Sequence, residues 1–541
     1  MSDTNDLINL FPEDDAVPDD FRHGPVTEQR DYLVNGEIRQ WPGALLPVVS
    51  PVCLRQGTHV EPVLLGHTPR LDSRTAMQAL DAAVAAYDNG RGAWPQMSLS
   101  RRIDRLEHLL AFMREQQASL VCGLMWEVGK RLEDARSEFD RTCQYIADTI
   151  AELRRPNQRD DTVAAEKGTL AHVRRRPVGV VLCMNPYNYP LYETFTTLIP
   201  ALAMGNSVVF KPSRFGVLLL RPFLAAFQRL FPAGAINVIY GKGRETVGAL
   251  LASGKVDLFA FVGTYRGAMS LSRLHPHPHR LRHVFGLDAK NPGIVLPDAD
   301  LDNAVRECLA GTLLFNGQRC TALKLLFVHE SVVNDFLEQF CRGVDAMKAG
   351  MPWESGVTLT PIPEPGKIGY LNELVADAKA KGASVINRGG GDHGASLFRP
   401  AVLYPVNPLM RVYQEEQFGP VIPVVPYADI DDVIEYVTDA DFGQQMSIFG
   451  RDPVAVGHLV DHCLSQVGRI NLNVQCQRGP DTLPFKGRKD SAEGTLSVSD
   501  ALRVYSTRTL VATRLDEGNR KLVGDVVRND QAGSPDVTSI L

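Results

Sequence analysis

The sequence is poor in cysteine, has no excess of positive charge and contains no long apolar run. Nine cysteines are scattered over 541 residues and no two form a CxxC pair, which argues against a disulfide framework. The 57 basic residues are outnumbered by 63 acidic ones, so we expect neither nucleic acid nor an anionic membrane as a partner. No apolar run reaches the ~18 residues that cross a bilayer, so we also expect no membrane span.

The N-terminal segment lacks the basic start and the apolar stretch of a signal peptide. Together with the scattered cysteines, this predicts a cytoplasmic protein. We expect residues 1–30 to be a flexible leader and residues 515–541 to be a loose C-terminal tail, because the tail is polar and lacks sustained periodicity. The whole chain has an ordinary globular composition, with 44% hydrophobic and 22% charged residues.

Apolar periodicity indicates the fold class. Residues 73–150 have apolar side chains three and four positions apart, which predicts helices. From Pro177 onward, short apolar runs alternate with helical patterns, and a second series of this kind starts near Gly293. In the first series the expected strands are 179–184, 207–211, 236–240 and 257–262. This alternation predicts an α/β fold with parallel, doubly wound sheets in two units that meet near 285–295.

Two loops that follow these strands carry residues suited to a dinucleotide. Lys211, Ser213 and Arg214 follow one strand, and Gly241 and Gly243 follow the next. Ligands of open α/β sheets lie at the carboxyl ends of the strands, so basic side chains and glycines at this edge can hold a phosphate or a ribose. The alternative is that the glycines only form a tight turn, because no GxGxxG motif is present.

The clearest chemical feature is the loop Asn316-Gly317-Gln318-Arg319-Cys320-Thr321, which places a thiol beside an arginine. A neighbouring cation and exposed loop amides favour the thiolate, which is the nucleophilic form of cysteine. Cys320 is therefore a candidate nucleophile, and an inert buried cysteine is the alternative interpretation.

A run of alternating histidine and proline at 275–279 invites a metal site. The prolines keep the loop extended, and no cysteine joins the histidines, so the ligands would converge poorly. We therefore expect no metal and interpret the run as a solvated loop.

Four motifs in succession resemble the aldehyde dehydrogenase superfamily. They follow YLVNGE (32–37) in the order typical of that superfamily: NPYNYP (185–190), GNSVVFKPS (205–213), NGQRCTA (316–322) and EEQFGPV (415–421). The resemblance extends to about Thr513. It implies an aldehyde-dehydrogenase-like fold with a Rossmann-type cofactor domain, an α/β catalytic domain and a small β oligomerisation arm.

The resemblance also implies domain boundaries and an assembly. The NAD(P)-binding domain is expected at 31–153 and 173–289, and the catalytic domain at 290–478. The oligomerisation element is expected at 154–172 and 479–514. Members of the superfamily form homodimers or homotetramers in which this arm adds a strand to a neighbour's sheet, so we expect a homo-oligomer.

The matched motif positions imply the catalytic roles. Cys320 matches the nucleophile, and Asn188 matches the amide that joins the Cys320 backbone N–H in an oxyanion hole. The implied cofactor contacts are Lys211 at the adenosine ribose, Thr264 at the pyrophosphate, Glu416 at the nicotinamide ribose and Phe418 beside the nicotinamide, with Ser213 and Gly243 in the adjoining loops. Many NAD-using relatives have a glutamate at the position of Arg214. A guanidinium favours the 2′-phosphate, so we expect NADP as the cofactor, with NAD possible.

A finer resemblance concerns the substrate. SEFDRT (137–142), GQRCTA and NVQCQRGPDTLPFKG (473–487) are most similar to the non-phosphorylating NADP-dependent glyceraldehyde-3-phosphate dehydrogenases. Three arginines of that branch gather at the substrate phosphate, and they match Arg141, Arg319 and Arg478 here, with Tyr189 and Thr321 beside them. This implies oxidation of D-glyceraldehyde 3-phosphate to 3-phosphoglycerate.

One position departs from the superfamily pattern. The glutamate that activates water for thioester hydrolysis is Gly286 here. Asp288 could replace it through a water molecule, or another carboxylate such as Glu416 could serve. A thiol such as coenzyme A could instead accept the acyl group, as in an acylating aldehyde dehydrogenase. The chain could also be a catalytically impaired member with a binding or structural role.

Overall fold

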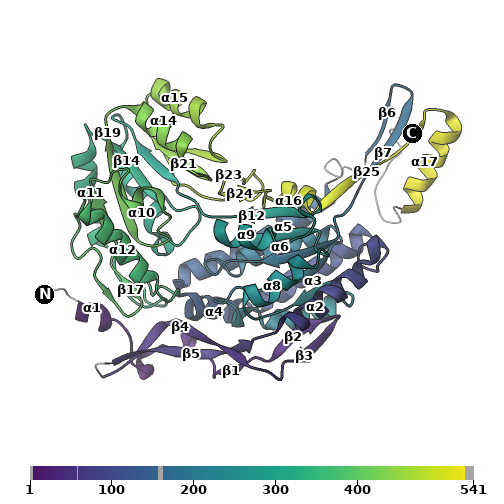
Figure 1. Ribbon diagram of the computed structural model, residues 1–541, viewed down its shortest axis with the longest axis horizontal. Coiled ribbons are helices and arrows are strands. Elements are labelled where there is room, and N and C mark those ends of the chain that lie inside the picture. The colour runs from purple at the N-terminus through teal and green to yellow at the C-terminus, as the bar shows by residue number, and fades with distance from the viewer. Residues whose placement is uncertain (1–3, 58, 156–161, 531–541) are drawn as a thin grey trace.

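The computed structural model describes residues 4–57, 59–155 and 162–530. Figure 1 shows two α/β units side by side, with a narrow arm that projects away from them and ends beside the C-terminal helix. A strand pair from the N-terminal part of the chain runs beneath both units.

The first unit contains an eight-stranded sheet in the order β24-β12-β11-β8-β9-β10-β2-β3. The five central strands, from β12 to β10 in this order, are parallel. The strands of the whole sheet are β2 (Asp31–Val34), β3 (Glu37–Gln40), β8 (Val180–Met184), β9 (Ser207–Lys211), β10 (Ile236–Val238), β11 (Leu258–Val262), β12 (Arg282–Gly286) and β24 (Ala492–Glu493). The four strands predicted between 179 and 262 are confirmed. They are continuous apolar runs because helices cover both faces of the sheet.

Helices cover this first sheet, and the helical prediction for 73–150 is confirmed. They are α2 (Ser73–Tyr87), α3 (Leu99–Glu115), α4 (Gln117–Val128), α5 (Leu132–Arg154), α6 (Tyr192–Ala203), α7 (Pro222–Leu230), α8 (Gly243–Ala252), α9 (Tyr265–Ser272) and α16 (Val498–Val504). In α5, Phe139, Tyr145 and Ile146 lie on one buried face at helical spacing. Within the described ranges, no helix is both long and apolar enough to cross a membrane.

The second unit contains a seven-stranded sheet in the order β15-β18-β19-β14-β13-β21-β22, parallel except for β15. Its strands are β13 (Pro292–Val295), β14 (Leu325–His329), β15 (Ser384–Val385), β18 (Ala401–Tyr404), β19 (Val421–Tyr427), β21 (Gln445–Phe449) and β22 (Arg469–Leu472). The surrounding helices are α10 (Leu301–Leu313), α11 (Val333–Asp345), α12 (Lys367–Ala380), α13 (Arg411–Gln414), α14 (Ile430–Asp439) and α15 (Pro453–Cys463). The α/β fold class predicted from the alternation is confirmed.

The arm is a three-stranded antiparallel sheet of β6 (Thr162–Glu166), β7 (Thr169–Pro177) and β25 (Ser506–Arg514). The hairpin expected at 154–172 lies partly outside the described residues, at 156–161. Only the end of the expected partner segment, β25, pairs with this hairpin. Residues 488–489 form β23, which pairs with β20 (Phe442–Gly443) of the second unit, and β24 pairs with β12 of the first. The chain therefore crosses both units before it reaches the arm.

Both ends of the chain are more structured than the sequence analysis predicted. The N-terminal segment forms α1 (Thr4–Ile8), and Leu7 and Phe11 are buried in one apolar cluster with Trp126. The strands β4 (Leu45–Gln56) and β5 (His59–Pro69) form the sheet next to this cluster. At the other end, α17 (Glu517–Asp530) packs against the arm, where Val523 contacts Leu170. The expectations of a flexible leader and a loose tail are therefore wrong for the described residues.

Candidate active site

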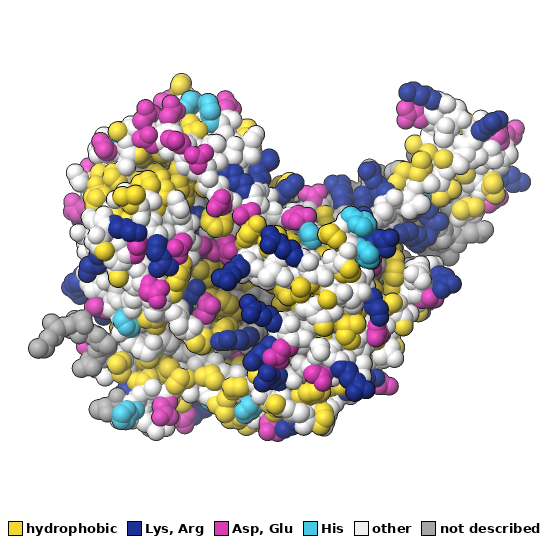
Figure 2. All heavy atoms as spheres, viewed as in Figure 1, with side chains coloured by type: hydrophobic (Ala, Val, Ile, Leu, Met, Phe, Trp, Pro, Cys, Tyr) yellow, Lys and Arg dark blue, Asp and Glu magenta, His cyan; other side chains and the backbone are white. Residues whose placement is uncertain are grey.

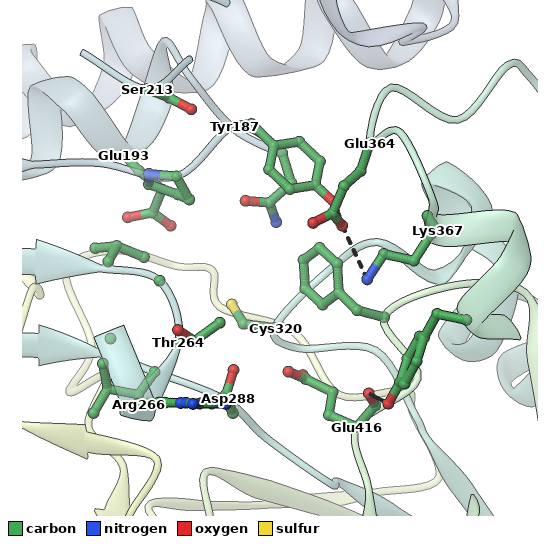
Figure 3. Close-up of a pocket in the computed structure, with 18 of the residues that line it drawn as sticks. Tyr187, Glu193, Ser213, Thr264, Arg266, Asp288, Cys320, Glu364, Lys367 and Glu416 are labelled. Carbon is green, nitrogen blue, oxygen red and sulfur yellow. Dashed lines mark hydrogen bonds and ion pairs between the residues drawn. The ribbon is translucent and has the colours of Figure 1, made fainter. Parts of the chain in front are cut away.

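A cavity of about 960 Å³ opens where the carboxyl ends of strands in both sheets meet. The first sheet contributes the residues that follow β8, β11 and β12, and the second unit contributes the loop that carries Cys320. Figure 3 shows the Cys320 thiol in the middle of this cavity, with Thr264 and Asp288 below it and Tyr187 and Glu364 above it. The lining also includes three sequence-predicted residues, Asn188, Glu416 and Phe418.

A second cavity of about 940 Å³ adjoins the first, and the two share Ser213 and the segment 364–366. It is lined by Lys211, Arg214 and Gly243, which the sequence analysis assigned to the adenosine end of a cofactor. Figure 2 shows lysine and arginine side chains gathered at the centre of this face, between the two units. The joined cavities form a channel that leads from a basic rim to the Cys320 thiol, and it lies at the carboxyl ends of parallel strands, where dinucleotides bind in open α/β sheets.

The rim of the channel combines one buried and one exposed cation. Lys211 ends β9, and its Nζ donates to the Pro212 carbonyl at 3.0 Å. Burial lowers the pKa of Lys211 to about 8. Arg214 is exposed, its guanidinium lies 4.5 Å from the centre of the Phe215 ring, and it makes no ion pair with the described residues. Arg214 is therefore available to an anionic ligand.

Two helix N-termini face the channel. Gly243 is the first residue of α8 and lines the second cavity, and a Cβ at this position would meet only Met184 Cε at 3.5 Å. Thr264 is the N-cap of α9, where its side chain accepts the Gly267 N–H at 3.1 Å, and it lines the first cavity. Helix N-termini present unpaired N–H groups, so both positions suit a phosphate.

The Cys320 loop is a strained turn after α10. Phe315 and Asn316 have φ of 52° and 54°, and Gly317 has φ of 71°. A Cβ at Gly317 would lie 2.7 Å from the Thr312 carbonyl oxygen and 2.9 Å from that of Gly419, so only glycine fits. The Cys320 carbonyl accepts the Asn291 side-chain N–H at 2.8 Å, which fixes the end of the turn. The backbone thus aims the thiol into the cavity.

Charges near Cys320 act against one another. Burial raises the pKa of the Cys320 thiol and the Glu193 carboxylate raises it further, whereas Lys324 and Arg478 lower it. The sequence analysis predicted that Arg319 favours the thiolate, and this is wrong. The Arg319 guanidinium donates to the Ala310 and Gly311 carbonyls at 3.1 and 2.9 Å, away from the neighbouring thiol.

Asn188 is buried beside the thiol, and a buried ion pair supports its loop. Its Nδ2 donates to the Gln318 carbonyl at 2.9 Å, which leaves the second N–H of the amide for a ligand. Lys130 Nζ donates to the Asn188 carbonyl at 2.8 Å and forms a fully buried ion pair with Glu138. The other Glu138 oxygen accepts the backbone N–H groups of residues 191 and 192, each at 3.0 Å. This pair links α5 to the turn that carries Asn188.

Five acidic side chains line the cavity that holds Cys320, and three of them, Glu416, Glu364 and Asp288, differ in their partners. Glu416 pairs with Lys324 and accepts the Ala289 N–H at 3.2 Å. Glu364 pairs with Lys367 at 2.9 Å. Asp288 accepts one backbone N–H, that of Tyr265, at 2.8 Å and has no ion pair among the described residues.

Of these carboxylates, Asp288 has the environment of a base. Burial raises the pKa of the Asp288 carboxyl, an effect that Lys324 and Lys367 partly offset. Gly286 lines the same cavity and provides no carboxylate.

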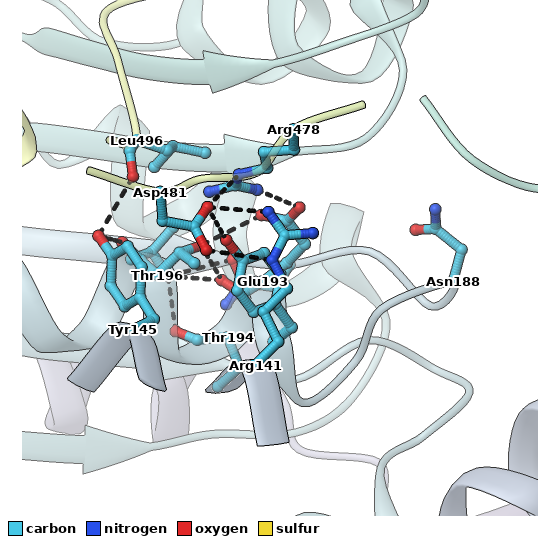
Figure 4. A network of polar contacts seen from close by, with 12 residues as sticks. Arg141, Tyr145, Asn188, Glu193, Thr194, Thr196, Arg478, Asp481 and Leu496 are labelled. Carbon is cyan, nitrogen blue, oxygen red and sulfur yellow. Dashed lines mark hydrogen bonds and ion pairs between the residues drawn. The ribbon is translucent and has the colours of Figure 1, made fainter. Parts of the chain in front are cut away.

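Two of the three arginines of the predicted phosphate cluster form ion pairs with acidic side chains (Figure 4). Arg141 makes two hydrogen bonds to Asp481, at 2.9 and 3.1 Å. Arg478 pairs with Glu193, and its Nε lies 3.6 Å from Asp481. The structure thus brings Arg141 and Arg478 together, but each has an acidic partner. The resemblance implies three arginines at a substrate phosphate, and two of the three have acidic partners here.

Arg319, Tyr189 and Thr321 lie next to this network. The Tyr189 ring lies under Lys130 Nζ, 3.6 Å from its centre, and contacts the Phe315 ring edge-on. Burial raises the pKa of Tyr189, and the charges of Arg319 and Arg141 both reach its hydroxyl. Thr321 is buried.

Sequence reasoning missed four charged residues of the site: Lys130, Glu193, Lys324 and Asp481. Glu193 is the one acid in the otherwise uncharged segment LYETFTTLIPALA (191–203). A single carboxylate on a fully buried helix must be paired or functional, and that signal could have identified it. Asp481 lies three residues after Arg478, a spacing that pairs them here. Lys324 gives no such signal, because its partner Glu416 is 92 positions away. Lys130 pairs with Glu138, eight positions away, which is not one of the helical spacings that indicate a pair.

Comparisons with known proteins agree with this geometry. The model of the Aldehyde dehydrogenase family matches residues 58–511. An NADP-dependent glyceraldehyde-3-phosphate dehydrogenase from Triticum aestivum is 29% identical over 436 residues, which cover 79% of this chain and 85% of the relative. A non-phosphorylating aspartate-semialdehyde dehydrogenase from Halomonas elongata is 29% identical over 443 residues, or 80% of this chain and 86% of the relative.

Among solved structures, an NADP-dependent glyceraldehyde-3-phosphate dehydrogenase from Bacillus halodurans C-125, complexed with NADP, is similar to this chain. It superposes with a TM-score of 0.82 at 29% identity. The match covers 91% of this chain and all of the other.

Proposed function

Because the chain belongs to the aldehyde dehydrogenase family, we propose that its NAD(P)-dependent oxidation of aldehydes takes place at Cys320. The observation that carries this proposal is the joint placement of the Cys320 thiol and the Asn188 amide in one cavity, at the end of a channel suited to a dinucleotide.

In the proposed reaction, the Cys320 thiolate adds to the aldehyde carbon and forms a tetrahedral thiohemiacetal. The free N–H of the Asn188 amide and the Cys320 backbone N–H stabilise the developing oxyanion, an effect commonly worth ~3–4 kcal/mol per donor. A bound nicotinamide dinucleotide supplies a hydride acceptor. Loss of the hydride leaves a thioester on Cys320. Lys324 lies near the thiol, and burial lowers the pKa of Lys324 to about 7, so near neutral pH it is partly charged and favours the thiolate.

The proposed cofactor is NADP. Lys211, Ser213, Gly243 and Thr264 line the channel where the adenosine and pyrophosphate groups would lie. Exposed Arg214 would pair with the 2′-phosphate. Glu416 and Phe418 would hold the nicotinamide end, and Glu416 would have to exchange its contact with Lys324 for the ribose.

Water is the proposed acyl acceptor, with Asp288 as the base. Asp288 forms no ion pair within the described part of the chain, and its raised pKa makes it more basic than an exposed aspartate. Coenzyme A remains the second candidate acceptor, because Gly286 removes the usual base. Acyl-thioester product in the presence of coenzyme A would distinguish the two.

The proposed substrate is an aldehyde with an anionic group. Arg319 and Arg478 are buried at the network next to the thiol, and each has side-chain N–H groups without a partner among the described residues. D-glyceraldehyde 3-phosphate is the first candidate, since the wheat and Bacillus relatives are named for it. A carboxylate-bearing semialdehyde is the second, because Glu193 and Asp481 neutralise two of the three arginines.

Rapid mixing of the enzyme with NADP and a panel of aldehydes tests the proposed function. We expect a burst of one NADPH per active site with at least one aldehyde, and no burst in Cys320→Ser. An equal burst in Cys320→Ser, or no burst with any phosphorylated, carboxylated or neutral aldehyde, would contradict it.

We also propose that the protein works in the cytoplasm as a homodimer or homotetramer that associates through the arm of β6, β7 and β25. Leu510 and Val511 on β25 are 61% and 46% exposed. Neighbouring apolar side chains that are this exposed mark a surface that another chain can cover. Light scattering should give a mass of two or four chains, and a single-chain mass would contradict the proposed assembly.

A further inference from the structure

Glu193 is a buried carboxylate at the substrate side of the cavity. It lies in the first turn of α6, is 5% exposed, and lines the same cavity as Cys320. Figure 3 shows Glu193 at the upper left of this cavity, on the same side as Ser213, with Cys320 below it. Among the acidic side chains, Glu193 is the one whose charge raises the pKa of Cys320, which places it within electrostatic reach of the reacting sulfur.

Both carboxylate oxygens of Glu193 have partners. One carboxylate oxygen pairs with Arg478, whose side chain is also 5% exposed. The other oxygen accepts the Thr196 hydroxyl at 3.1 Å. The first turn of a helix stabilises negative charge as well. Glu193 therefore places an acidic partner inside the cluster of arginines at the substrate side of the cavity.

Counting the network charges shows the effect of Glu193. Arg141 and Arg478 are balanced by Asp481 and Glu193, so Arg319 provides the single unbalanced positive charge. Neighbouring Lys130 is balanced by Glu138. Without Glu193 the same network would carry two unbalanced positive charges, which is what a dianion requires.

The network also holds arginine N–H groups without partners. Nε and Nη2 of Arg478 and Nε of Arg319 are buried and have no hydrogen-bond partner among the described residues. Buried donors without a partner lower the stability of the folded protein unless a ligand pairs with them. One unbalanced positive charge matches a carboxylate better than a phosphate ester, which carries about −1.5 to −2 at pH 7.

We infer that Glu193 is the specificity-determining residue of the substrate end, and that it selects an aldehyde carrying a single carboxylate over one carrying a dianionic phosphate. This inference rests on the proposed aldehyde oxidation and chooses between its two candidate substrates. Glu193 acts in two ways: it cancels the charge of Arg478, and it repels a second negative charge on the ligand.

Glu193→Gln tests the inference, because glutamine keeps the size and the Thr196 contact and removes the charge. The probes are D-glyceraldehyde 3-phosphate and succinic semialdehyde, with kcat/KM measured for each at pH 8. The wild type should prefer the semialdehyde. In Glu193→Gln, the ratio of kcat/KM for the phosphorylated substrate to kcat/KM for the carboxylated substrate should rise by about tenfold or more. Glu364→Gln is the matched control, since Glu364 lines the same cavity but pairs with Lys367, and its ratio should stay within about twofold.

A wild-type preference for the phosphorylated aldehyde would overturn the inference and leave the proposed function intact. An unchanged ratio in Glu193→Gln would also overturn it. A second measurement needs neither a variant nor turnover: calorimetric titration of the wild-type enzyme and NADP with propionate or methyl phosphate. Propionate should bind more tightly than methyl phosphate, and the reverse order would overturn the inference even if Glu193→Gln does not fold.

Discussion

Placing a glutamate at position 286 should restore rapid thioester hydrolysis. Gly286 is the last residue of β12, and it lines the cavity that holds Cys320. A Cβ at this position would lie 3.5 and 3.6 Å from the two Val262 methyl groups and 4.0 Å from Leu496 Cδ1, which are ordinary contacts. The backbone is not in the left-handed region, so Gly286→Glu introduces no strain, and the new carboxylate would reach into the cavity.

The expected gain follows from the role of a general base. A positioned base accelerates proton transfer by about 10²-fold to 10⁴-fold, or ~3–5 kcal/mol of barrier. If Asp288 already acts as the base, the gain in the wild-type background will be smaller. We therefore expect the full effect in Asp288→Asn, where Gly286→Glu should rescue steady-state turnover and leave the NADPH burst rate unchanged.

The assay compares burst and steady-state phases of NADPH formation by stopped flow, with Gly286→Gln as the control of equal size. Turnover should rise with glutamate and not with glutamine. Equal turnover for glutamate and glutamine would refute the reasoning, because it would show that water activation does not limit the second half of the reaction.

Three further predictions concern the oxyanion hole, the cofactor and the thiol. Asn188→Ala should lower the hydride-transfer rate about 10²-fold to 10³-fold with little change in KM, and a burst at the wild-type rate would exclude Asn188 from the oxyanion hole. Arg214→Glu should invert the kcat/KM ratio of NADP to NAD in favour of NAD; an unchanged ratio would mean that Arg214 does not contact the 2′-phosphate. Because the Glu193 carboxylate raises the pKa of Cys320, Glu193→Gln should move the pH profile of Cys320 alkylation to lower pH. Peptide mass spectrometry follows this profile, and a shift to higher pH would contradict the assigned electrostatics.

The fold was largely predictable from the sequence because its signals are local and repeated. Buried parallel strands such as 207–211 are short apolar runs, and the helices between 73 and 150 have clear apolar faces. The chain ends were predicted less well. Leu7 and Phe11 are two apolar residues in an acidic segment, and their burial depends on Trp126, more than 100 positions away.

The placement of single residues was predictable, as with Cys320, Asn188 and Lys211, which all line the two cavities. The site was less predictable where function depends on pairing. Three arginine positions imply a phosphate site only if no acid neutralises them, and the contacts of Arg478 with Glu193 span 285 positions. Sequence spacing does not specify such contacts, and they decide the net charge of the site.

The most direct test of the account is mass spectrometry of the acyl-enzyme. Because Gly286 removes the usual base, mixing the enzyme with NADP and a turning-over aldehyde should leave a thioester that acid quenching traps. The account predicts an acyl group on the peptide that contains Cys320, formed in equal amount to the burst of NADPH. NADPH formation without an acyl group on Cys320, or with the acyl group on another cysteine, would contradict it.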